Sequence, residues 1–229
     1  MTSYWQHVWQ HLQKDLRIEW RSRDAINGML FFALLVVVVF SLAFDPTANP
    51  TMARQISGGV LWVAILFATT TALNQTWTRE QRNAVLEAQR MAPAPASALF
   101  VGKVLANLLF VGIIEAVLAP LFTIFYNLHP LGQTWLFALV MPLGTWALLC
   151  NGTFFAALGL RTRNRELLLP LILFPISLPA LLAMINASAG ILTGDEGFNP
   201  TLWIRMLAGY DIIFTIVCLL LFETVLNAE

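Results

Sequence analysis

The hydrophobic positions of this chain fall into six long runs that short polar segments separate. Each run is long enough to cross a hydrocarbon core about 30 Å thick as an α-helix, which needs roughly 20 mostly apolar residues. Long apolar runs of this kind favour helices over strands. The pattern predicts an all-α, polytopic membrane protein, a single transmembrane domain over residues 1–229 with six transmembrane helices at 28–44, 58–76, 98–125, 134–160, 167–190 and 202–226.

Residues 3–24, ahead of the first run, have a different pattern. Their large apolar side chains recur at helical spacing, and basic side chains lie on another face of the same helix. A helix of this kind lies in the membrane interface, with tryptophans at the level of the lipid headgroups. The sequence therefore predicts an N-terminal amphipathic interfacial helix, with Trp5, Val8, Trp9, Leu12, Leu16 and Trp20 on the apolar side and Lys14, Arg17 and Arg21 on the polar side.

Composition agrees with a membrane protein. Only 11% of the residues are charged and 58% are hydrophobic, whereas soluble domains have about 25% charged residues. The polar segments are too short to form a separate soluble domain, because small chains bury too little surface to fold alone. Cys150 and Cys218 both fall in predicted spans, so we expect no disulfide framework.

The formal net charge is zero, but the basic residues are distributed unevenly. Basic residues near the ends of spans favour the cytoplasmic side of a membrane. With the N-terminus inside, eleven lysines and arginines are cytoplasmic and two, Arg54 and Arg205, are outside. This orientation predicts that both termini and the segment 77–97 are cytoplasmic.

Residues 77–97 form the longest polar interruption between two spans. Thr78 is a suitable N-cap for a short helix, and Pro93 and Pro95 end such a helix because proline disfavours helical geometry at the residue before it. We expect a short surface helix tethered closely between the second and third spans. A soluble partner bound to it would move both spans.

Two acidic residues lie within spans, and burying an ionisable group in a bilayer is costly. For Glu115 the sequence leaves two interpretations open, a functional acid or a hydrogen bond between helices. For Asp211 we expect the hydrogen bond. Three prolines in the fifth span, Pro170, Pro175 and Pro179, predict a kinked or broken helix.

Common catalytic motifs are absent from the sequence. It contains no G-x-x-x-x-G-K-[ST] loop for ATP, no H-E-x-x-H zinc motif and no G-x-S-x-G nucleophile elbow. His129, before Pro130, is either a haem ligand on the outer side or a turn residue, and the turn is favoured. We expect no catalytic residues, no bound metal and no nucleic-acid partner.

Four features together resemble the haem exporter protein B family (CcmB type), the membrane subunit of the cytochrome c maturation ABC-type complex. The resemblance covers nearly the whole chain. The run of prolines is its most specific part. The features are GGVLWVA at 58–64, Leu86-Glu87 followed by Pro93, Pro95 and Gly102-Lys103, LPLILFPISLP at 169–179, and six spans with an amphipathic N-terminal helix.

The resemblance implies an ABC-2-like transmembrane domain in the bacterial inner membrane, present as a homodimer and without enzyme activity of its own. ATP would be bound by a separate cytoplasmic ABC ATPase. The other partners implied are a haem-handling membrane protein, a small single-span subunit and a periplasmic haem chaperone. Segment 77–97 would be the coupling helix that docks on the ATPase through Arg79, Glu80, Arg82, Leu86, Glu87 and Arg90.

Haem would then be a transported or relayed ligand rather than a resident cofactor. ATP hydrolysis would drive either haem export or release of the haem-loaded chaperone. Two alternatives remain open at this point. The chain is a passive scaffold that assembles haem-handling partners without coupling energy, or it is an intramembrane enzyme that uses Glu115, which is disfavoured because no second catalytic group is apparent at that depth.

The predicted orientation can be tested with a cysteine at Asn83. A membrane-impermeant maleimide added to intact cells should leave this cysteine unlabelled and should label it after permeabilisation. A cysteine at Thr51, in the segment expected outside, should be labelled in intact cells. Labelling of position 83 in intact cells would show that the topology is the reverse of the predicted one.

Overall fold

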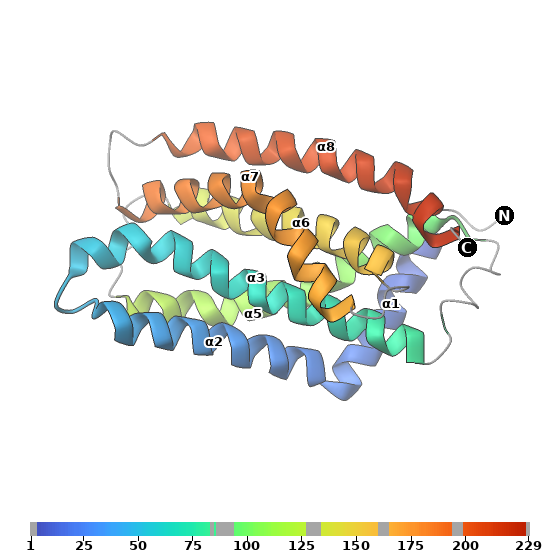
Figure 1. Ribbon diagram of the computed structural model, residues 1–229, viewed down its shortest axis with the longest axis horizontal. Coiled ribbons are helices and arrows are strands. Elements are labelled where there is room, and N and C mark those ends of the chain that lie inside the picture. The colour runs from blue at the N-terminus through green and yellow to red at the C-terminus, as the bar shows by residue number, and fades with distance from the viewer. Residues whose placement is uncertain are drawn as a thin grey trace.

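The computed structural model describes residues 4–82, 85, 94–126, 134–159, 165–193 and 199–227, and all regular structure in these ranges is helical. The helices pack as an elongated bundle (Figure 1). Six of them are long and apolar enough to cross a membrane, which confirms the polytopic all-α fold. The helices are α1 (Tyr4–Ser22), α2 (Asp24–Phe44), α3 (Pro50–Arg82), α5 (Ala96–Phe125), α6 (Thr134–Gly159), α7 (Arg165–Thr193) and α8 (Pro200–Asn227).

Helix α1 lies at one end of the bundle and crosses the direction of the long helices there (Figure 1). Arg23, with φ of 56° in the left-handed region, joins it to α2. Val8 and Leu12 are buried, whereas Trp5, Trp9 and Trp20 are exposed. Helix α1 therefore has the buried and exposed faces of an amphipathic helix. We call this end of the molecule the α1 end.

Helix α3 differs from the expected pattern. From the sequence we expect a loop before Gly58 and a new helix capped by Thr78, but α3 runs without a break from Pro50 to Arg82. Pro50 occupies the first turn, where its missing N–H costs nothing. The Thr78 hydroxyl donates to the Asn74 carbonyl inside the helix, so Thr78 is not an N-cap. The 33-residue helix is ~50 Å long, so it extends beyond a ~30 Å hydrocarbon layer.

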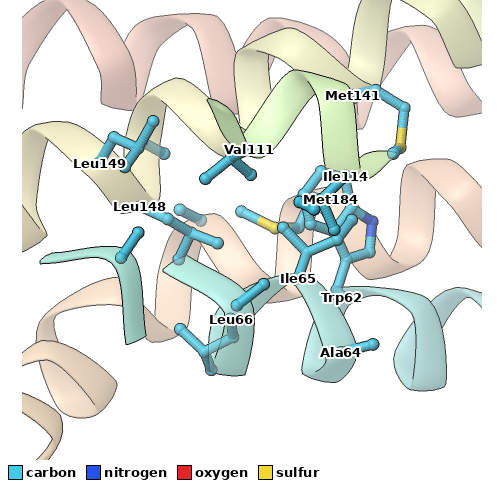
Figure 2. Packing of buried hydrophobic residues seen from close by; sticks show 14 of the residues in the cluster. Trp62, Ala64, Ile65, Leu66, Val111, Ile114, Met141, Leu148, Leu149 and Met184 are labelled. Atoms are coloured by element: carbon cyan, nitrogen blue, oxygen red, sulfur yellow. The ribbon is translucent and has the colours of Figure 1, made fainter. Parts of the chain in front are cut away.

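The hydrophobic core lies around α3. In its most apolar window, 72% of α3 residues are buried, against 22% for α8 at the outer edge. Figure 2 shows Trp62 and Ile65 of α3 packed among side chains of neighbouring helices, including Val111, Leu148 and Met184. Helix α3 is therefore the central element of the bundle.

Trp62 fixes the packing of α3 against two neighbours. Its indole Nε1 donates to Ser188 Oγ of α7 at 2.8 Å. The ring also lies against Gly144 of α6, where an added Cβ would come within 2.2 Å of the Trp62 ring. Only glycine leaves room for the ring at that position. A similar contact joins Leu73 to Gly152, where an added Cβ would lie 2.3 Å from Leu73 Cδ1.

Helix α7 contains the three prolines of the fifth span and is nevertheless continuous from Arg165 to Thr193. It is therefore not broken, and Figure 1 shows that it bends. Proline lacks the N–H that a helix needs and displaces the preceding turn, which causes such bends. Beside Pro175, the Ile176 carbonyl accepts a hydrogen bond from Tyr210 OH of α8 at 2.9 Å. Asn151 Nδ2 of α6 donates to the same Tyr210 oxygen at 2.8 Å.

The Trp62 contact predicts the effect of two alanine substitutions. Gly144→Ala should lower the free energy of unfolding by about 1–3 kcal/mol, because the hydrogen bond to Ser188 holds the ring that a methyl group would displace. Gly112→Ala is the matched control, since its added Cβ would meet nothing within 4 Å. Unfolding in mixed micelles, followed by tryptophan fluorescence, measures both. Equal midpoints for the two variants would contradict this packing.

Candidate functional site: a buried charge cluster at the α1 end

Six charged side chains from three helices meet at the α1 end, and four of them are buried. Three positive and three negative groups take part, so the formal charges balance. We call this set the charge cluster: Lys14, Asp15 and Glu19 of α1, Arg79 and Glu80 of α3, and Lys103 of α5.

A glycine allows the helices to approach closely enough to form the cluster. An added Cβ at Gly102 of α5 would lie 2.7 Å from His11 Cβ and 3.1 Å from the Val8 carbonyl oxygen of α1. Because Gly102 has no side chain, α5 packs directly on α1. The next residue, Lys103, then lies between acidic groups of α1 and α3.

Lys103 is the innermost cation of the cluster, with 0% of its side chain exposed. Its Nζ lies 2.7 Å from Glu80 Oε2, 3.6 Å from Asp15 Oδ2 and 4.5 Å from the centroid of the Trp77 ring. A position near the end of a span usually lets a lysine extend to the interface. Here the two carboxylates and the aromatic face hold the ammonium inside the protein instead.

Lys14 closes the same group from the α1 side. Its Nζ lies 3.1 Å from Asp15 Oδ1 and donates to Glu80 Oε1. Burial would lower the pKa of Lys14, but the Asp15 and Glu80 carboxylates outweigh burial and raise that pKa above its ordinary value. Burial lowers the pKa of the neighbouring His11, and the Lys14 charge lowers it further. Lys14 is therefore held charged, while His11 favours its neutral form.

Arg79 holds the junction between α1 and α2. Its Nη1 donates to Glu19 Oε2 at 2.6 Å, and its Nη2 donates to Asp24 Oδ2 at 3.4 Å. The other Glu19 oxygen accepts from the backbone N–H groups of Ala25 and Ile26 at 3.0 and 3.3 Å. A carboxylate at the start of a helix satisfies free N–H groups and interacts favourably with the helix dipole. One residue of α3 thus contacts both α1 and α2 where they join.

A small cavity adjoins the cluster between α1, α3 and α5. Its volume is ≈ 20 Å³, and its polar lining includes Asp15, Glu19, Arg79 and Asn107. This is room for one water molecule with several hydrogen-bonding partners. The cluster is therefore packed almost completely.

The expected ATPase contacts divide into three groups. Glu80 is only 5% exposed, so the prediction that it contacts a partner at the surface is wrong: ion pairs with Lys14 and Lys103 hold it inside. Arg79 is partly exposed and paired. Arg82 ends α3, but its side chain lies outside the described part of the chain, as do Leu86, Glu87 and Arg90, so their contacts stay a prediction.

Sequence reasoning did not identify Lys14, Asp15, Glu19 and Lys103 as one site. A usable signal was nevertheless present on α1. Asp15 and Glu19 follow Val8 and Leu12 at helical spacing and lie on the same buried face. Acidic residues on the apolar stripe of an amphipathic helix indicate that cations lie on the element packed against it.

The two intramembrane acids differ in their surroundings. Thr145 Oγ1 of α6 donates to Glu115 Oε1 of α5, so Glu115 joins two helices. This contact supports the packing interpretation over the intramembrane enzyme, since no second acid or base of the described residues contacts Glu115. For Asp211 the expected hydrogen bond between helices is wrong, because neither carboxylate oxygen has a partner among the described residues. His129 lies outside the described part of the chain.

Comparison with known proteins supports one family along almost the whole chain. The family model described as CcmB protein matches residues 6–226, which include the entire charge cluster. Heme exporter protein B of Rhodobacter capsulatus is 31% identical over 198 residues, which are 86% of this chain and 88% of that protein. The protein of the same name from Pseudomonas aeruginosa is 29% identical over 195 residues, 85% and 86% of the two chains.

The Arg79 contacts predict how the junction between α1 and α2 resists protease. Arg79→Ala would leave the buried Glu19 carboxylate without its cation, and a hydrogen bond to a charged group contributes ~1.5–3 kcal/mol. We expect trypsin to cleave the purified protein after Arg21 and Arg23 at least ~10-fold faster. Arg54→Ala, which removes an exposed arginine from the other end of α3, is the control. Unchanged cleavage in Arg79→Ala would show that Arg79 does not hold the junction.

Proposed function

This chain belongs to the CcmB protein family and is a multi-pass membrane component of a haem export system, and we propose that it couples ATP hydrolysis by a separate ATPase to that system. The coupling element is the α1 end, where α3 projects beyond the membrane. The single observation that carries the proposal is the buried Glu80–Lys103 ion pair, at 2.7 Å, between the two helices that flank the polar segment 83–95. The similarity to heme exporter protein B supports a place for this chain in a haem export system.

Helix α3 forms an uninterrupted connection between the polar segment and the core. Helix α3 is continuous from the central core, at Trp62, to Arg82. Because no loop interrupts the helix, a force applied at Arg82 is transmitted to the core. The helix after the polar segment, α5, begins at Ala96 and contributes Val111 and Ile114 to the same core. A soluble partner that contacts the segment acts on both helices.

Ion pairs of the charge cluster join α3 and α5, so that the two helices move together. Glu80 and Lys103 join α3 to α5, and Asp15, Lys14 and Glu19 join both to α1. Removing one partner of a buried ion pair is strongly destabilising, by ~3–5 kcal/mol. The ends of α1, α3 and α5 therefore move as one body. Helix α1, whose exposed tryptophans lie in the membrane interface, moves with them.

The proposed complex contains several partner proteins and a second copy of this chain. The ATPase lies in the cytoplasm of a bacterial cell and binds the ATP, and both termini of this chain are on the same side of the inner membrane. Two copies of this chain pair with two ATPase copies. A haem-handling membrane protein, a small single-span subunit and a periplasmic haem chaperone complete the complex. The distribution of basic residues and the family membership support this arrangement.

Haem is the substrate of the complex in this proposal, either exported or relayed to the chaperone that is then released. A passive scaffold is the second candidate, and no described contact favours it over coupling. The two differ in one respect, because a scaffold needs assembly only. If this chain couples energy, cells whose ATPase partner binds but cannot hydrolyse ATP should lose mature c-type cytochromes, measured by haem staining. Normal maturation in those cells would favour the scaffold.

Docking of the ATPase is tested by charge reversal in the polar segment. The double variant Arg82→Glu with Glu87→Arg should reduce co-purification of the ATPase at least ~10-fold, or by 1.4 kcal/mol, because it reverses the charges expected to contact it. Arg54→Glu is the control, since that residue lies at the opposite end of α3. Deleting residues 84–91 leaves the charge cluster in the chain. ATPase binding that survives this deletion would exclude the coupling role.

A further inference from the structure

A groove open to the surface runs between α6 and α8, far from the charge cluster in sequence. Its volume is ≈ 550 Å³, which is the size of a cavity that holds several large side chains. Leu143 and Trp146 of α6 line one side, and Ala208, Ile212 and Thr215 of α8 line the other. The lining is almost entirely apolar. Its polar groups include the Thr215 hydroxyl, which accepts a hydrogen bond from Trp146, and the Asp211 carboxylate.

The Asp211 carboxylate is buried without a partner. The residue is 7% exposed, and both carboxylate oxygens are buried with no hydrogen bond from any described residue. The indole N–H in the groove is already engaged, because Trp146 Nε1 donates to Thr215 Oγ1 at 2.9 Å. The other buried acidic residues of the described chain, Asp15, Glu19, Glu80 and Glu115, each have a partner. A buried polar group without a partner is costly, so a donor brought into the groove by another molecule would stabilise Asp211.

The depth of Asp211 restricts what the donor is. The residue lies eleven positions after the start of α8 at Pro200, so it is ~16 Å along a helix ~42 Å long. This position is well inside a hydrocarbon layer about 30 Å thick. Lipid headgroups and bulk water do not reach that depth. The donor must therefore arrive on a group that itself spans the membrane.

The surface around the groove suits a second helix. Helix α8 is the least buried of the spans, and Ile212 and Ile216 are exposed beside Asp211. At Gly209, one turn before Ile213, an added Cβ would meet nothing within 4 Å. Small residues at such a surface let another backbone approach closely, which is how helices associate in membranes.

A second copy of this chain is the wrong occupant for the groove. Two copies related by a two-fold axis along the membrane normal bring equal depths together, so Asp211 would face Asp211. Like charges at close range oppose ionisation of both groups. The exposed Arg205 of α8 lies six residues closer to Pro200, ~9 Å from the depth of Asp211. Lys103 is buried in its own cluster.

We propose that the α6–α8 groove docks a transmembrane helix of a different protein chain, and that a lysine or arginine near the middle of that helix pairs with Asp211. The apolar lining receives the neighbouring side chains of the incoming helix. The ion pair sets its depth and rotation, because only one position brings the cation to the carboxylate. This inference is independent of ATPase coupling, since the groove and the charge cluster share no residue.

The test uses the full-length chain in phosphatidylcholine vesicles and a dye-labelled leucine–alanine transmembrane peptide with one central lysine. A water-soluble maleimide dye at Asn199→Cys, which is exposed next to α8, reports binding by energy transfer. Cys150 and Cys218 are buried and escape the dye. The lysine peptide should associate at least ~5-fold more tightly than a matched peptide with central leucine, or by ~1 kcal/mol.

Variants separate the ion pair from simple apolar contact. Asp211→Asn should reduce the lysine peptide to the level of the leucine peptide, and Glu115→Gln, at a buried acid that already has a partner, should leave the preference unchanged. Asp211→Lys should instead prefer a peptide with central aspartate, which also shows that the variant folds. Equal association of both peptides with the unmodified chain would overturn the proposal. The proposal would also be overturned if labelled copies of the chain showed energy transfer to one another, Asp211→Asn abolished that transfer, and neither peptide was preferred. A second copy would then occupy the groove.

Discussion

A lysine with no exposed surface is the constraint on which the α1 end of this protein depends. An ammonium group removed from water is stable only when carboxylates at short distance replace the hydration it loses. Glu80 and Asp15 do this for Lys103, and they come from two different helices. Neither helix can move away alone without leaving the cation uncompensated. The position of one side chain therefore requires that α1, α3 and α5 stay together.

Two regions of the bundle are held together by different physical interactions. Around Trp62 the helices are joined by close apolar packing and by glycines that leave no free space. Such packing is dense and tolerates little change. At the α1 end, ion pairs and a helix cap carried by Glu19 hold the helices. Glu80 pairs with both Lys14 and Lys103, so shared charges rather than close apolar packing resist separation of the helices at this end.

The same rule explains why Asp211 is unlike the other buried acids. Asp15, Glu19 and Glu80 have cations within the chain, and Glu115 has the Thr145 hydroxyl. Asp211 lies on the least buried of the spanning helices, in a groove whose lining is mostly apolar. The chain satisfies its buried charges where its own helices meet. Asp211, which has no partner among the described residues, lies instead in a groove open to the surface.

Hydropathy was enough to predict the six spans and the amphipathic α1, because burial of apolar surface decides both. It failed at the end of α3, since the polar run from Thr78 to Arg82 has the composition of a surface segment. The ion pairs that keep this run helical and partly buried join residues 66 positions apart, as for Lys14 and Glu80. Periodicity within one helix cannot reveal such partners. The same limit led to the expectation that Asp211 is hydrogen-bonded, which depends on what the neighbouring helix offers at that depth.

A double-mutant cycle on Glu80 and Lys103 tests the central interaction most directly. The free energy of unfolding of the purified chain is measured for Glu80→Gln, Lys103→Met and the double variant. If the ion pair joins the helices as described, each single change costs ~3 kcal/mol or more, and the double variant costs less than the sum of the two by at least ~1 kcal/mol. Additive losses would contradict the account, because the two side chains would then contribute independently to the fold.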